Sequence, residues 1–186
     1  MKKTVLLLGA GKIGRMIARL LMDSGDYIVR VGDAFEDALA RLQERVPTVE
    51  TRVVDATSIS DLESAMQGCE AVISALSFRF NANVAQAALT SGISYFDLTE
   101  DVATTRAVRA IAEHAKPGQV FVPQCGLAPG FVGIVASDLA SWFDELESVR
   151  MRVGALPEFP TNALTYNLTW STDGLINEYC NPCDAI

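Results

Sequence analysis

Three glycines near the start of the chain have the spacing of a phosphate-binding turn. Gly9, Gly11 and Gly14 follow an apolar run and open a helical pattern. Gly9 permits a tight turn, Gly11 leaves room for a pyrophosphate beside the backbone, and Gly14 lets the helix pack close to the strand. The free N–H groups at the start of such a helix point at the phosphate. The motif, which includes Lys12 and Ile13, therefore predicts a dinucleotide site.

A carboxylate stands where dinucleotide-binding proteins hold the adenosine ribose. Asp33 ends a second apolar run, roughly 20 residues beyond Gly14. It can accept hydrogen bonds from both ribose hydroxyls and repels a 2′-phosphate, so the sequence favours NAD over NADP as the cofactor. The alternative is a glycine turn in another α/β fold, with Asp33 only capping the next helix.

Composition and charge restrict the class of protein. The chain has 186 residues, of which 49% are hydrophobic and 20% charged, as in ordinary globular proteins. The formal net charge of −8 argues against a nucleic-acid partner. Apolar runs are broken by Gly or charge within about ten residues, which argues against a membrane span or a signal peptide. We therefore expect a cytoplasmic protein whose four cysteines are reduced thiols.

Strand-like and helical segments alternate through the first two thirds of the chain. After the glycine motif, strands are expected at 27–32, 49–54, 71–76, 93–98 and 119–122, and helices at 35–46, 58–66, 83–90 and 102–115. This alternation predicts an α/β fold of Rossmann type, a doubly wound parallel sheet with helices on both faces. Ligands of such sheets bind beyond the carboxyl ends of the strands.

The pattern changes beyond Gly126. A helix is expected over 131–142, and the segments 149–153 and 164–170 then alternate apolar and polar residues, as strands with one buried face do. The apolar face of the second segment needs a cover; its members are Leu164, Tyr166, Leu168 and Trp170. We expect that a longer enzyme or a second copy of the chain supplies this cover.

Four segments together resemble the saccharopine dehydrogenase family, which includes saccharopine reductases and lysine 6-dehydrogenases. These segments are the glycine motif and residues 95–100, 123–130 and 172–179. The Gly-Leu-Ala-Pro-Gly run at 126–130 is far more specific than the glycine motif, which many enzymes share. The resemblance covers essentially the whole chain.

The resemblance implies an NAD(P)-dependent oxidoreductase that acts on the C–N bond of an amino acid of the saccharopine or lysine type by direct hydride transfer. It also implies a dinucleotide-binding domain, here residues 1–125, followed by a substrate and homodimerisation domain, of which residues 126–186 would be an incomplete beginning. Two alternatives stay open: a non-catalytic module that senses NAD, and a polyamine-type enzyme that joins an aldehyde and an amine reductively. Fold alone does not separate them.

Further candidates for the cofactor site share a place at the end of an expected strand or just after it: Asp55, Ala56, Ser74, Ala75, Leu76 and Thr99. The resemblance puts an acid such as Asp55 at the adenine amino group, although Asp55 could also cap the next helix. It puts Thr99 beside the nicotinamide. A small residue after the fourth strand would let the backbone pass the pyrophosphate.

Glu100 and Gly126 are the candidates for substrate contacts. Glu100 could bind a substrate amine, or could only favour the positive end of the following helix. Phe78 and Phe80 could shield the nicotinamide or fill the core. Hydride transfer needs no nucleophile, so we interpret Cys125 as a packing residue. The catalytic acid–base residue is not assigned.

No metal site is expected from the sequence. The single histidine, His114, lies late in an expected helix, where it would favour the negative helix end or face solvent. Cys180 and Cys183 form a CxxC motif, but a zinc site would need a second pair, which Cys69 and Cys125 do not supply.

Overall fold

Six parallel strands form one sheet in the order β3-β2-β1-β4-β5-β6. They are β1 (Lys3–Leu8), β2 (Tyr27–Asp33), β3 (Glu50–Val53), β4 (Ala71–Ser74), β5 (Ser94–Asp97) and β6 (Phe121–Val122). The computed structural model describes residues 2–154, 158–159, 161–163, 168 and 172–180. The expected doubly wound sheet is confirmed, and its strand order reverses between β1 and β4, where such folds bind ligands.

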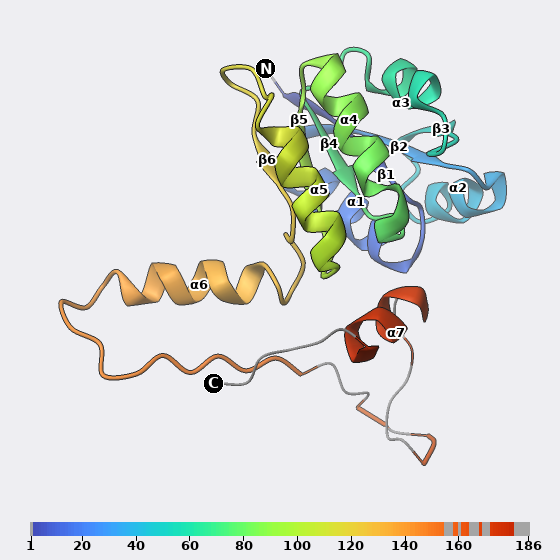
Figure 1. The fold of residues 1–186 in the computed structure, drawn as a ribbon. Coiled ribbons are helices and arrows are strands. Elements are labelled where there is room, and N and C mark those ends of the chain that lie inside the picture. Colours follow the sequence, from blue (N-terminus) through green and yellow to red (C-terminus); the bar gives the residue numbers. More distant parts are fainter. Residues whose placement is uncertain (1, 155–157, 160, 164–167, 169–171, 181–186) are drawn as a thin grey trace.

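Helices cover both faces of the sheet (Figure 1). They are α1 (Lys12–Ser24), α2 (Glu36–Gln43), α3 (Ile59–Met66), the short 3₁₀ helix η1 (Phe78–Phe80), α4 (Asn81–Ser91) and α5 (Val102–Ala112). Side chains alternate between the two faces of a strand. Leu7 of β1 therefore packs in one apolar cluster with residues of α1 and α2, whereas Leu6 and Leu8 pack in another with residues of α3, α4 and α5.

Residues near the helix ends set the boundaries of these elements. The hydroxyl of Ser58 accepts a hydrogen bond from the N–H of Asp61 at 3.3 Å, and so caps α3 as the sequence predicts. The carboxylate of Asp101 caps α5 in the same way, through the N–H of Thr104 at 2.6 Å. The first of these caps lies in the turn after β3, and the second in the turn after β5.

The chain after β6 lies outside these three layers (Figure 1). It contains α6 (Phe131–Ala140), where a helix was expected, and α7 (Thr172–Cys180). No residue of α6 is buried. No helix in the described residues is long and apolar enough to cross a membrane.

The strand expected over 149–153 is wrong. These residues form no strand, and the side chains of Val149, Met151 and Val153 are exposed. An alternating pattern records one apolar face, but a strand forms only when a neighbouring strand supplies hydrogen bonds. The other expected strand, 164–170, lies outside the described residues except for Leu168.

Candidate functional site

Two of the three glycines of the motif are required by the protein's own backbone packing. Gly9 has a φ of +102°, and a Cβ there would lie 2.8 Å from the carbonyl oxygen of Ala75. A Cβ on Gly14 would overlap the carbonyl oxygen of Gly9. Gly11, by contrast, has an ordinary φ of −69°, and a Cβ there would meet nothing within 4 Å. The protein itself therefore needs glycine at 9 and 14, whereas position 11 borders open space.

A cavity of about 340 Å³ lies against this motif. Its lining comes from the glycine motif, from the segments after β4 and β5, and from α7: Gly11, Lys12, Ile13, Gly14, Ala75, Leu76, Ser77, Phe78, Leu98, Thr99, Glu100 and Gly174. The structure thus brings together eight of the expected site residues from three separate segments. The expected residues outside this lining are Gly9, Asp33, Asp55, Ala56, Ser74 and Gly126.

The N-terminus of α1 faces this cavity without a side-chain cap. Gly11 occupies the cap position and offers no side chain, and its carbonyl oxygen accepts the first helical bond, from the N–H of Arg15. The N–H groups of Lys12, Ile13 and Gly14 have no partner within the helix, as at any helix start. Together with the helix dipole they form a site suited to an anion.

Ser77 also lines the cavity, although the cofactor-site candidates chosen from this segment were Ser74, Ala75 and Leu76. Its hydroxyl oxygen is buried and has no hydrogen-bond partner among the described residues. Ser74, which was expected at the site, is instead buried outside the lining and donates a hydrogen bond to the side chain of Asn81 at 2.7 Å. The two serines stand close together in the sequence, and only their partners distinguish them. Ser74 holds the start of α4 through Asn81, whereas Ser77 has a hydroxyl available to a ligand.

Asp33 joins the carboxyl end of β2 to the glycine motif. One carboxylate oxygen accepts the N–H of Ala10 at 2.7 Å, and the other accepts the N–H of Phe35 at 2.9 Å. Each oxygen of a carboxylate can accept two hydrogen bonds. The side chain therefore keeps acceptor capacity for ribose hydroxyls while its negative charge is held beside the motif.

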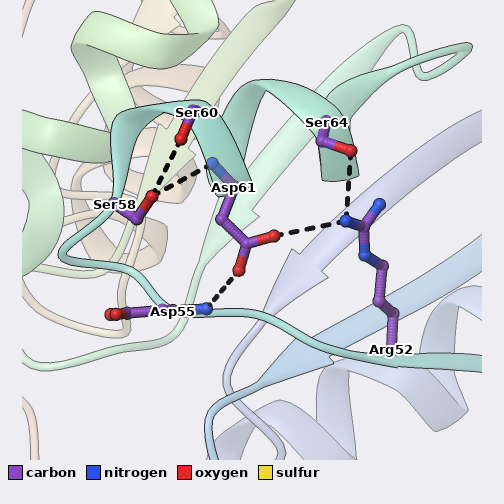
Figure 2. A network of polar contacts seen from close by, with 6 residues as sticks. All are labelled: Arg52, Asp55, Ser58, Ser60, Asp61 and Ser64. Carbon is purple, nitrogen blue, oxygen red and sulfur yellow. Dashed lines mark hydrogen bonds and ion pairs between the residues drawn. The ribbon is translucent and has the colours of Figure 1, made fainter.

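Asp55 lies at the carboxyl edge of the sheet in a network of polar contacts (Figure 2). One of its oxygens accepts both the N–H and the hydroxyl of Thr57, and these two bonds lower the pKa of Asp55. Its own N–H donates to the carboxylate of Asp61, which also pairs with Arg52. Because Ser58 caps α3, a helix cap at Asp55 is wrong, and its contact with adenine stays a prediction. Its neighbour Ala56 is partly buried and packs against the core.

Thr99 and Glu100 line the cavity from the turn after β5. The hydroxyl oxygen of Thr99 accepts the N–H of Asp101, the cap of α5. The carboxylate of Glu100 accepts a hydrogen bond from the side chain of Asn177, in α7, at 3.4 Å. The cap of α5 is Asp101 and not Glu100, whose carboxylate borders the cavity. Phe78 lines the cavity as well.

The segment after β6 packs against the turn after β5, which lines the cavity. A Cβ on Gly126 would approach the carbonyl oxygens of Pro129 at 3.2 Å and Leu98 at 3.4 Å, so Gly126 allows close backbone packing.

Burial raises the pKa of the Cys125 thiol, and the nearby Asp97 raises it further. The raised pKa keeps this thiol protonated, as its interpretation as a packing residue requires.

The cysteine and histidine side chains of the described residues do not form a metal centre. No group of three or more His, Cys, Asp or Glu side chains with the arrangement of metal ligands is found there. Cys69 is buried and Cys180 exposed, and both are free thiols. Cys183 lies outside the described residues, so its part of the CxxC motif has no structural description.

Comparison with known proteins identifies the family. Residues 5–122 match the family model described as the saccharopine dehydrogenase NADP binding domain. The chain belongs to this family. The resemblance seen in the sequence is thereby confirmed, and the matched residues run from β1 to β6, across the whole sheet.

Solved structures share the fold at low sequence identity. Apo saccharopine dehydrogenase (L-Glu forming) from Saccharomyces cerevisiae matches with a TM-score of 0.73 at 22% identity, over 94% of this chain and 40% of the yeast chain. Pen from Bacillus thuringiensis matches with 0.56 at 20%, over 66% of this chain and 49% of its own. GenD2 from gentamicin A biosynthesis, in complex with NAD, matches with 0.54 at 19%, over 75% and 39%. The chain thus spans less than half the length of these three proteins.

Proposed function

We propose that this chain is the NAD-binding part of an oxidoreductase that acts on the C–N bond of an amino acid of the saccharopine or lysine type by direct hydride transfer. Membership of the saccharopine dehydrogenase family supports a dehydrogenase. The observation that carries the proposal is the cavity, which combines an uncapped helix N-terminus with the open space at Gly11 and the unpartnered hydroxyl of Ser77.

The residues around the cavity fit a dinucleotide. The N–H groups at the start of α1 would hold the pyrophosphate, and Ser77 would satisfy its hydroxyl on a ribose or phosphate oxygen. Thr99 and Glu100 would border the nicotinamide, which when bound gives or takes a hydride. The carboxylate of Glu100 would attract the ammonium group of an amino-acid substrate. The acid–base residue stays unassigned.

The description of the family model names NADP. The proposed preference for NAD therefore rests on Asp33 alone. Asp33→Ser removes the negative charge that would repel a 2′-phosphate. We expect the ratio of NADH to NADPH affinity, measured by titration of nicotinamide fluorescence, to fall about tenfold or more, as the loss of roughly 1.4 kcal/mol of discrimination gives. Asp26→Ser, an exposed aspartate just before β2, is the matched control and should leave the ratio unchanged. A wild-type chain that prefers NADPH would overturn the assignment.

The reaction is tested on the protein in its natural full length. Lysine, saccharopine and related amino acids are offered with NAD, and formation of NADH is followed by absorbance. We expect turnover with at least one amino acid whose amine nitrogen is bonded to the oxidised carbon. Tight NAD binding without turnover on any of them would instead indicate a sensing module. Consumption of NADPH with an aldehyde and an amine would indicate a reductive condensation.

A further inference from the structure

We propose that Asp97 is a positioning residue that fixes the nicotinamide side of the cofactor cavity. Asp97 is the last residue of β5, is fully buried and does not line the cavity. The sequence shows it only as one residue of a segment that resembles the family. The proposal rests on the proposed function, since it concerns how this chain shapes its dinucleotide site.

The side chain of Asp97 holds two segments together. One carboxylate oxygen accepts the N–H of Thr99 at 2.9 Å and the N–H of Gln124 at 3.0 Å. The backbone oxygen of Asp97 accepts the N–H of Cys125 at 2.7 Å. Asp97 thus ties the turn after β5 to the turn after β6, in addition to the single ladder between these short strands.

These two turns determine where the lining residues lie. Gln124 has a φ of +64°, in the left-handed region that residues with a Cβ seldom adopt. The bond from its N–H to Asp97 holds it there, and the chain then brings Gly126 against the carbonyl oxygen of Leu98. Since Leu98 and Thr99 both line the cavity, a loss of the Asp97 carboxylate would loosen that wall.

The chemistry of the site explains why an acid stands here. A carboxylate only accepts hydrogen bonds, and Asp97 is surrounded by donors, with the hydroxyl of Tyr95 on its second oxygen at 2.7 Å. Burial and the neighbouring Asp97 raise the pKa of Tyr95, which keeps that hydroxyl protonated as a donor. Among the described residues no cation forms an ion pair with Asp97, so these hydrogen bonds are what compensates its burial there.

The test separates the two halves of the cofactor. ADP-ribose carries the adenosine and the pyrophosphate but no nicotinamide, whereas NADH carries all three. We expect Asp97→Ala to leave the Kd for ADP-ribose within about twofold and to raise the Kd for NADH about tenfold, as the loss of hydrogen bonds to a buried charge would. Tyr95→Phe removes only the bond to the second oxygen and keeps those to Thr99 and Gln124, so it should shift the ratio of the two Kd values less than Asp97→Ala does.

The outcomes distinguish the positioning role of Asp97 from the proposed function. A folded Asp97→Ala variant with both Kd values unchanged, or with both raised equally, would overturn the positioning role. A wild-type chain that binds neither ligand would overturn the proposed function itself. If the alanine variant does not fold, Asp97→Asn carries the test: an amide oxygen is a weaker acceptor than a carboxylate, so the ratio should still shift by about two- to threefold. An unchanged ratio in that variant would overturn the proposal.

Discussion

Leu42 and Leu139 show how the two regions of this molecule differ. Leu42 lies in α2 and is 0% exposed, whereas Leu139 lies in α6 and is 45% exposed. The difference comes from a second layer: α2 packs against the sheet, but none of the described residues buries a side chain of α6. The comparison teaches that apolar residues at helical spacing predict a helix, whereas burial depends on a partner that the pattern does not reveal.

The largest effect on stability is expected when leucine is changed to alanine in each of the two regions. Leu42→Ala should lower the free energy of unfolding by about 2–5 kcal/mol, because it leaves a cavity beneath α2. Leu139→Ala should change it by less than about 0.5 kcal/mol, as at other exposed sites. Urea denaturation followed by circular dichroism measures both. Equal losses at the two positions would mean that α6 is packed in solution, and the comparison would fail.

A smaller effect on stability is expected at helix ends, and it is compared between the start of α3 and the end of α6. Ser58→Ala removes the hydroxyl that caps α3 and should cost about 1 kcal/mol of stability. Ser141→Ala is the control, since Ser141 is an exposed residue at the end of α6 whose hydroxyl donates to the carbonyl oxygen of Asp138. The same denaturation assay should show little change there. A loss at Ser141 as large as that at Ser58 would place α6 in the cooperative unit.

Much of the fold could be predicted because its signals are local. The glycine turn and the cap at Ser58 depend on a few neighbouring residues, and the structure has both where they were expected. The expected strand over 149–153 failed because alternation does not supply a pairing strand. The homodimer and the domain boundary at residue 125 stay predictions.

The site could be predicted only in part. The glycine motif identified the wall that α1 supplies, because that wall follows from backbone geometry. Ser77 and Asp97 could not be ranked from sequence, because their importance lies in burial and in partners from distant segments. Ser74 illustrates the same limit, since a small polar residue at the end of β4 looked available but is bonded to Asn81.

Binding of NADH to Gly11→Val tests the central claim most directly. A Cβ at Gly11 meets no protein atom within 4 Å, so valine should fold normally while it occupies the space through which the proposed pyrophosphate would pass. Gly133→Val, at a glycine in α6 that also borders open space, is the matched control. Calorimetric titration should show NADH affinity at least about tenfold weaker in Gly11→Val and unchanged in Gly133→Val. Unchanged affinity in a folded Gly11→Val variant would contradict a dinucleotide site at this motif.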